Sequence, residues 1–127
     1  MEFNGNKPIF LQIYDVIIDK LLSGELQNNE RMLSVRDMGE KMLVNPNTVQ
    51  RAYTALQEKG IVEQQRGIGF FTTTNAAYIS KATRRDEFIK DQLPQMFRAM
   101  ELLGIDWSEL KKLFENAKEH GKDEKAN

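Results

Sequence analysis

Apolar residues recur at three- and four-residue steps near the start of the chain, which is the spacing of one face of a helix. This stripe consists of Phe10, Ile13, Tyr14, Ile17 and Leu21, and Ser23-Gly24 supplies a stop. The pattern predicts a first helix over about 8–22.

Two further helix starts follow a polar stretch at 25–31. Ser34 can cap a helix with its hydroxyl, and Asp37 three residues later approximates a capping box. Asn45 is a good N-cap and Pro46 fits the first helical position, so a third helix begins directly after the second. We expect a short helix that ends near residue 42, a tight turn, and a longer helix that ends at Gly60.

The third helix has one apolar side and one polar side. The apolar side carries Val49, Ala52, Tyr53 and Leu56, which predicts that Tyr53 is a core residue rather than a base-stacking one. The opposite side carries Asn47, Gln50, Arg51, Thr54 and Glu58. A polar face of this kind is ordinarily solvated surface, so by itself it does not indicate a partner.

A β-hairpin is predicted directly after the third helix. Segments 61–66 and 70–74 are rich in strand formers and flank Gly67-Ile68-Gly69, whose glycines permit a tight reversal. Two short helices, a tight turn and a hairpin form the layout of a winged helix-turn-helix. A helix fits the major groove of DNA, where Asn and Gln can pair with adenine and Arg with guanine.

The second half of the chain contains a different apolar pattern. Its seam alternates four- and three-residue steps, as in a coiled coil: Ile89, Leu93, Met96, Met100 and Leu103. Pro94 removes one backbone donor within this run, so we expect a kink or a break there. The seam could pack against this chain's own helices or against a second copy.

Capping signals place one more helix near the end of the chain. Gly104 fits a left-handed cap, and Asp106 with Glu109 forms a capping box for a helix over about 107–119. We expect three parts: a winged helix-turn-helix domain at 1–74, called the reading domain below, a helical region at 75–119, and a charged, frayed tail at 120–127. The predicted fold class is mainly α with a small β-hairpin wing.

Composition excludes several classes of function. The chain of 127 residues contains no cysteine, which excludes disulfides and Cys-based metal sites. The N-terminus lacks the pattern of a signal peptide, and no long apolar run occurs, so we expect a cytoplasmic protein without a membrane partner. His120, the one histidine, has no nucleophile or carboxylate arranged around it. We expect no enzyme activity, no metal and no cofactor.

The sequence of residues 31–72 is more specific than the pattern of elements. It reads RMLSVRDMGEKMLVNPNTVQRAYTALQEKGIVEQQRGIGFFT. These residues resemble the DNA-binding domain of the GntR family of bacterial transcription regulators. The length and pattern of the remaining 53 residues, 127 minus 74, resemble the YtrA-type subfamily, whose short C-terminal region is a dimerisation element. This resemblance implies that the helical region at 75–119 is a dimerisation region and that the seam residues Ile89, Leu93, Met96, Met100 and Leu103 face a second copy.

This resemblance implies a set of DNA contacts: Arg36 on the second helix, Asn45, Asn47, Thr48, Gln50 and Arg51 around the third, and Arg66 with Gly67 in the wing. Three positions depart from the family pattern. Leu33 stands where proline is usual, Leu43 where glycine is usual, and Ile68 where a polar or basic wing-tip residue is usual. Leu43 requires either an unstrained turn or a left-handed conformation that costs about 1 kcal/mol or more.

Charge limits how such a protein can bind DNA. The chain has 18 Lys+Arg against 19 Asp+Glu, a net charge of -1. Without a broad positive surface, useful affinity should come from two motifs acting together. The sequence therefore predicts a homodimeric regulator, a repressor of a palindromic operator in double-stranded DNA.

Some assignments stay open at this point. One alternative function is a protein-interaction module that keeps a winged helix without DNA binding. Another is a regulator with an unknown small-molecule effector between the C-terminal helices, in a pocket lined by Tyr78, Phe88, Phe97, Trp107 and Phe114, although core packing is the favoured account of these aromatics. Arg84, Arg85 and Lys81 could reach the DNA backbone or form a solvated helix face.

Overall fold

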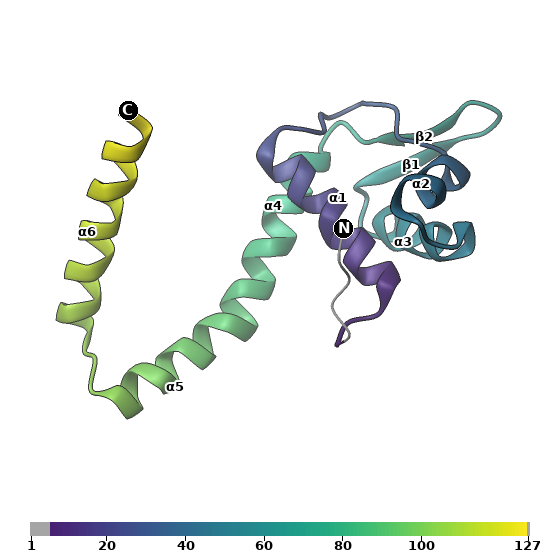
Figure 1. Cartoon of the computed structure of the whole chain (residues 1–127). Coiled ribbons are helices and arrows are strands. Elements are labelled where there is room, and N and C mark those ends of the chain that lie inside the picture. Colours follow the sequence, from purple (N-terminus) through teal and green to yellow (C-terminus); the bar gives the residue numbers. More distant parts are fainter. Residues whose placement is uncertain (1–5, 127) are drawn as a thin grey trace. The chain divides into compact units, whose positions relative to one another are not determined.

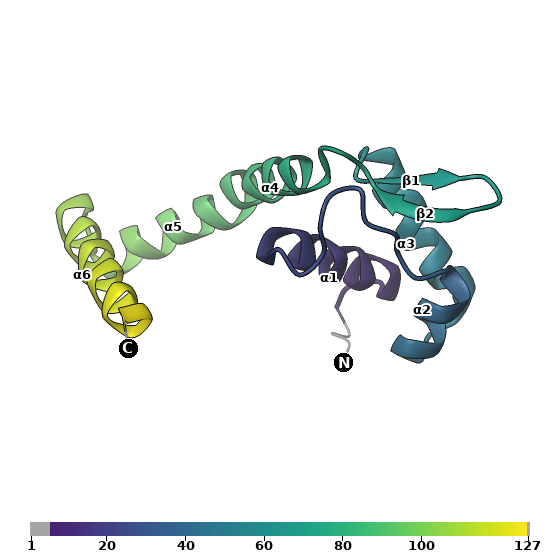
Figure 2. The ribbon, with the colours of Figure 1, turned by 90° about the horizontal axis from the view of Figure 1, so that it is seen from above.

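The computed structural model describes residues 6–126, and the side chains of residues 6–121 (Figures 1 and 2). The elements are α1 (Ile9–Ser23), α2 (Val35–Met42), α3 (Pro46–Glu58), β1 (Val62–Gln65), β2 (Gly69–Thr72), α4 (Ala76–Glu87), the π-helical turn η1 (Phe88–Gln92), α5 (Leu93–Leu103) and α6 (Trp107–Ala126). The predicted class, mainly α with a small hairpin, is confirmed. None of the helices in the described range is long and apolar enough to cross a membrane.

Local capping signals set the helix starts of the first half. The Ser34 hydroxyl accepts a hydrogen bond from the Asp37 amide at 3.0 Å, which begins α2. The Asn45 side chain accepts from the Asn47 amide at 2.8 Å, and Pro46 occupies the first turn of α3. Both predicted caps are confirmed.

The core of the first half lies between α1, α3 and the hairpin (Figure 1). All four apolar positions predicted for α3 are buried. The Tyr53 ring meets Phe70 edge-to-face at 4.9 Å, and its hydroxyl donates to the Leu33 carbonyl at 2.7 Å. Burial raises the pKa of Tyr53 above its usual value. Tyr53 is therefore a core residue that also holds the segment leading into α2, as the sequence pattern predicts.

The hairpin is extended by the segment that precedes α2. β1 and β2 pair in antiparallel register, with Val62 opposite Thr72. Arg31 forms a bridge with Phe71 on the free edge of β2, and the Met32 amide donates to the Phe70 carbonyl at 2.8 Å. This edge of the wing is therefore paired rather than open.

The buried Thr72 hydroxyl ties the hairpin to the loop after α1. It donates to the Gln27 carbonyl at 2.6 Å and accepts from the Glu30 amide at 2.9 Å. These partners lie 45 and 42 residues earlier in the chain. One side chain thus satisfies two polar groups of a loop that carries little secondary structure.

The chain divides into two compact units, the first ending at Arg85 and the second beginning at Asp86. This boundary lies later than the predicted one at residue 74, because the first turns of α4 belong to the reading domain. Ala76 and Ser80 are buried, and Arg84 donates to an Asp19 carboxylate oxygen at 3.0 Å and to the Asp15 carbonyl at 3.2 Å. Arg84 therefore anchors α4 on α1 within the first unit.

Pro94 changes the helix type instead of ending the helix. The residues before it form η1, in which the Leu93 amide donates to the Phe88 carbonyl five residues earlier. A proline has no amide hydrogen and its ring clashes with the carbonyl four residues before it, so a wider turn at this point relieves the clash. The predicted kink or break is thus a π-helical turn with helical residues on both sides.

The end of the chain departs further from the predicted pattern. Gly104 adopts the left-handed conformation at φ 70°, and the Asp106 side chain accepts from the Glu109 amide at 2.9 Å, so both capping signals are confirmed. The predicted helix end at Glu119 is wrong, because α6 continues through Ala126. Apart from Gly121, residues 119–126 are mostly Glu, Lys and Ala, which favour helix. Of the predicted tail, Asn127 lies outside the described residues.

Candidate nucleic-acid interface

The turn between α2 and α3 depends on a glycine inside α2. Gly39 is buried, and a Cβ atom at this position would lie 2.8 Å from the Val44 carbonyl oxygen. The Val44 amide donates to the Gly39 carbonyl at 2.9 Å. Gly39 therefore lets the backbone of the turn approach α2 closely. This role of Gly39 is not among the predictions, although a glycine within a helical pattern can indicate close packing of the backbone.

Leu43 ends α2 in the left-handed conformation, with φ 59° and ψ 45°. Its side chain is 89% exposed, so burial does not compensate for the conformation. The sequence left open whether the turn at Leu43 is unstrained or left-handed, and the structure has the left-handed conformation. Such a conformation costs a residue with a Cβ atom about 1–2 kcal/mol.

The N-terminal half of α3 presents the polar residues predicted to read DNA. Asn45, Asn47, Gln50 and Arg51 are exposed, and Thr48 is half-buried. Asn45 has a structural task as well, because its side-chain oxygen caps the helix. The Arg51 guanidinium lies 4.1 Å from the centre of the Phe10 ring in α1, a cation–π contact that orients this side chain.

Arg36 lies on α2 with its side chain 82% exposed. Within the described part of the chain it forms one ion pair, with Glu40 one turn later, at 3.8 Å. An exposed ion pair of this length contributes little to stability, since water screens both charges. The guanidinium is therefore available to an external anion.

Arg31, which is not among the predicted site residues, supports the wing tip. Arg66 and Gly67 are exposed at the tip, and Gly67 has φ 77°. The Arg31 Nη2 atom donates to the Ile68 carbonyl at 2.7 Å. Arg31 and Ile68 lie 37 residues apart in the sequence, so this contact becomes apparent only in the fold.

All eight predicted DNA-contact residues lie in the first unit, on α2, on α3 with its capping residue, and on the hairpin turn. α3 contacts both α2 and β1, and Figures 1 and 2 both place the hairpin beside α3. The arrangement holds three exposed arginines, Arg36, Arg51 and Arg66, on three neighbouring elements. Arg84 is not part of this surface, because it pairs with α1, while Lys81 and Arg85 are exposed.

The described residues contain no cluster of three or more His, Cys, Asp or Glu that could hold a metal ion. The chemistry that this surface offers is hydrogen bonding and charge, on a helix with the dimensions of a reading helix.

A model of the family described as "Bacterial regulatory proteins, gntR family" matches residues 10–72. The HTH-type transcriptional regulator YhcF of Bacillus subtilis (strain 168) is 36% identical over 109 residues, which cover 86% of this chain and 88% of the relative. The chain belongs to the gntR family. It is a DNA-binding transcription regulator and not an enzyme.

Two further relatives extend the likeness beyond the reading domain. The HTH-type transcriptional repressor YtrA of Bacillus subtilis (strain 168) is 34% identical over 121 residues, 95% of this chain and 90% of the relative. A transcriptional regulator from Oenococcus oeni has a structure that matches with a TM-score of 0.77 and 26% identity, over 92% of this chain and 96% of that one. The resemblance to the YtrA type is thereby confirmed over the short C-terminal region as well.

The second unit exposes the apolar residues predicted to form the seam. Ile89, Met96 and Leu103 are 49%, 38% and 72% exposed, while Leu93 and Met100 are half-buried. The expectation that the aromatic residues form a core is wrong within a single chain, since all five are exposed: Tyr78, Phe88, Phe97, Trp107 and Phe114. Tyr78 lies on α4 in the first unit, and the other four lie in the second unit, where two helices and a π turn provide too few layers to bury them.

Proposed function

We propose that the chain acts as a homodimeric repressor that binds a palindromic operator in double-stranded DNA. The observation that carries the dimer is the exposed apolar surface of the second unit, where η1, α5 and α6 bury none of their large apolar residues fully. An apolar surface of this extent in water favours association. A second copy presents the same surface, which is the requirement of a two-fold interface.

Two reading units in one dimer place two α3 helices on the same DNA. In helix-turn-helix dimers the reading helices enter the major groove about 34 Å apart, one turn of the double helix. We propose that Asn47, Gln50 and Arg51 read bases, and that Arg36 and Arg66 contact phosphates. Their exposure and their places on α2, α3 and the wing support these roles.

Repression is proposed from the name of the relative YtrA, a transcriptional repressor. Because family members are bacterial regulatory proteins and bacterial DNA lies in the cytoplasm, we propose that this protein acts there. The alternative of a protein-interaction module without DNA binding is less well supported, since such a module has no reason to keep three exposed arginines on the reading surface.

Sedimentation of seam variants tests the dimer. Leu93→Asp and Met100→Asp each place a charge in the proposed interface and should convert a dimer into monomers. Gln95→Asp introduces the same charge on an exposed position of α5 outside the seam and should sediment as the unchanged chain does. If all three variants keep the sedimentation coefficient of the unchanged chain, the proposed seam is refuted.

Binding to DNA can be measured on the same variants. The monomeric variants should lose operator affinity much more than the Gln95→Asp control, because the second reading unit no longer acts as part of the same molecule. Equal affinity of monomer and dimer for the operator would contradict the requirement for paired half-sites.

A further inference from the structure

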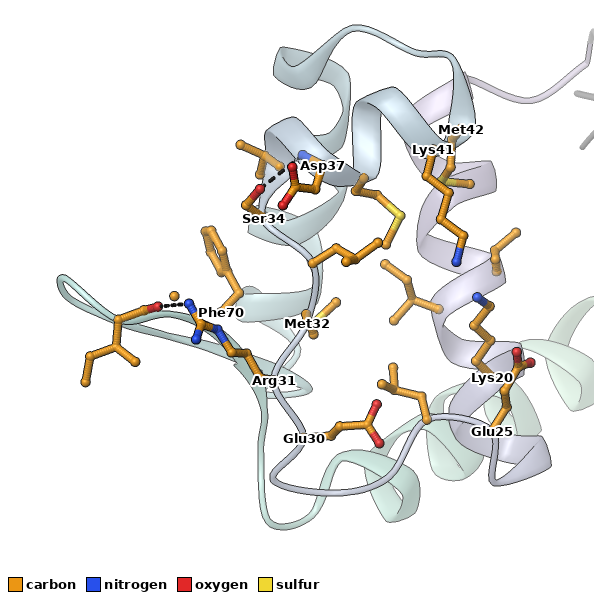
Figure 3. Close-up of a pocket in the computed structure, with 18 of the residues that line it drawn as sticks. Lys20, Glu25, Glu30, Arg31, Met32, Ser34, Asp37, Lys41, Met42 and Phe70 are labelled. Carbon is orange, nitrogen blue, oxygen red and sulfur yellow. Dashed lines mark hydrogen bonds between the residues drawn. The ribbon is translucent and has the colours of Figure 1, made fainter.

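A groove of about 1180 Å³ lies within the first unit, between α1, α2 and the hairpin (Figure 3). Much of its wall is apolar, with Val16, Leu26, Met32, Val35, Met38 and Met42 among the lining residues. The volume is sufficient for a small organic molecule. Methionine side chains are flexible and polarisable, so this wall can adapt to ligands of different shape.

Two lysines stand at one end of this groove. Lys20 extends from α1 and Lys41 from α2, and their ammonium groups point toward each other (Figure 3). Glu25, Glu30 and Asp37 also line the groove, but none of them is within ion-pair distance of either lysine. Two like charges that face each other beside an apolar wall repel, and an anion placed between them would be stabilised by both.

We propose that this groove binds an amphipathic monocarboxylate, with its carboxylate between Lys20 and Lys41 and its hydrocarbon chain along the methionine-lined wall. A single negative charge fits the site better than a polyanion, because three carboxylates share the groove with the cations. This site is distinct from a pocket between the C-terminal helices, since every lining residue belongs to the first unit.

Ligand binding in the groove is coupled to DNA binding, a step that rests on the proposed function. Arg31 lines the groove and also donates to the Ile68 carbonyl at the wing tip. Leu33 and Ser34, which lead into α2, line the groove as well. An occupant therefore contacts the supports of two DNA-facing elements. If the ligand changes operator affinity by some factor, DNA changes ligand affinity by the same factor.

Methionine methyl NMR on the full-length chain tests the site without DNA. Octanoate should shift the labelled methyl resonances of Met32, Met38 and Met42, while those of Met96 and Met100 in the second unit stay unchanged. 1-Octanol and octylammonium control for the head group and should bind at least roughly fivefold more weakly, because neither offers a carboxylate to the lysines.

Charge-removing variants test the proposed head-group contacts. Lys20→Gln and Lys41→Gln should each weaken octanoate binding roughly fivefold. Lys81→Gln, an exposed lysine of α4 that does not line the groove, should leave binding unchanged. Neither substitution changes the apolar wall of the groove, so both variants should fold. Methyl spectra recorded before ligand is added check this, because an intact fold leaves the methionine resonances of each variant unchanged.

The outcomes separate this proposal from the proposed function. Shifts at Met96 and Met100 instead of the groove methionines, no shifts at all, or equal binding of octanoate and 1-octanol would each overturn the site. Groove shifts that depend on both lysines support the site even if the chain proves not to bind an operator. Coupling is supported if octanoate changes operator affinity at least twofold in the unchanged chain but not in Lys20→Gln, and refuted if both respond equally.

Discussion

Replacing Leu43 by glycine should stabilise the reading domain. Leu43 holds φ 59° and ψ 45°, a conformation that glycine adopts without the clash of a Cβ atom. Because the Leu43 side chain is 89% exposed, its removal sacrifices little buried apolar area. The substitution therefore removes strain at the turn without opening a cavity.

The expected gain follows from two opposing terms. Relief of the left-handed conformation contributes about 1–2 kcal/mol. Glycine also makes the unfolded chain more flexible, which costs about 0.4–1 kcal/mol. Leu43→Gly should therefore raise the free energy of unfolding of the first unit by about 0.8 kcal/mol, the difference between the middle values of the two terms.

Hydrogen exchange of the buried amides of α3 measures this gain in the first unit alone. Leu43→Ala is the matched control, because alanine removes the same exposed side chain but keeps a Cβ atom in the left-handed conformation. The slowest α3 amides should exchange more slowly in Leu43→Gly than in both the unchanged chain and Leu43→Ala. If the glycine and alanine variants exchange at the same rate, backbone strain at this turn is not the cause.

Three other substitutions test separate contacts. Gly39→Ala should destabilise the first unit by about 1–3 kcal/mol in the same exchange measurement, because the new Cβ would lie 2.8 Å from a carbonyl oxygen. Gly121→Ala in α6 is the control: its Cβ would meet no atom within 4 Å, so it should not destabilise the first unit. Thr72→Val should cost about 1–3 kcal/mol through two unsatisfied loop groups, and Thr72→Ser should restore most of this; equal losses would contradict the hydrogen-bond account. Arg66→Ala should lower affinity for all DNA sequences alike and reduce the slope of log K against log salt by about 1 for each protomer, as fluorescence anisotropy can determine; an unchanged slope excludes a phosphate contact.

The features that the sequence predicts correctly are those encoded within a few residues. The caps at Ser34 and Asn45 each join groups two or three residues apart, so the local amino-acid sequence is sufficient to predict them. The buried side of α3 follows from its periodicity in the same way. Local signals therefore set the helix starts and the core face of the reading domain.

Contacts between distant segments could not be predicted in this way. The bond from Arg31 to the wing tip spans 37 residues, and those of Thr72 span 42 and 45. Nothing in the spacing of Arg84 indicates that it pairs with α1 rather than with DNA. Their roles depend on which segments the fold brings together, and so does the boundary between the two units.

The C-terminal part shows a second limit of pattern analysis. Periodicity correctly marks apolar positions on α5, but it does not state whether they pack within the chain or against another copy. The five aromatic residues illustrate this, because their apolar character favoured a core and the structure exposes all of them. A proline signal likewise indicates an interruption without specifying a π-helical turn.

Selection of binding sites from a pool of random double-stranded DNA tests the central claim most directly. A dimer with two α3 reading helices should enrich an inverted repeat whose half-sites have centres about 10 base pairs apart, or a multiple of one helical turn. Enrichment of that repeat by the unchanged chain, and its loss in Gln50→Ala or Arg51→Ala, is the predicted result. Failure to enrich any motif, or enrichment of a single unpaired site, would contradict a homodimer that reads a palindromic operator.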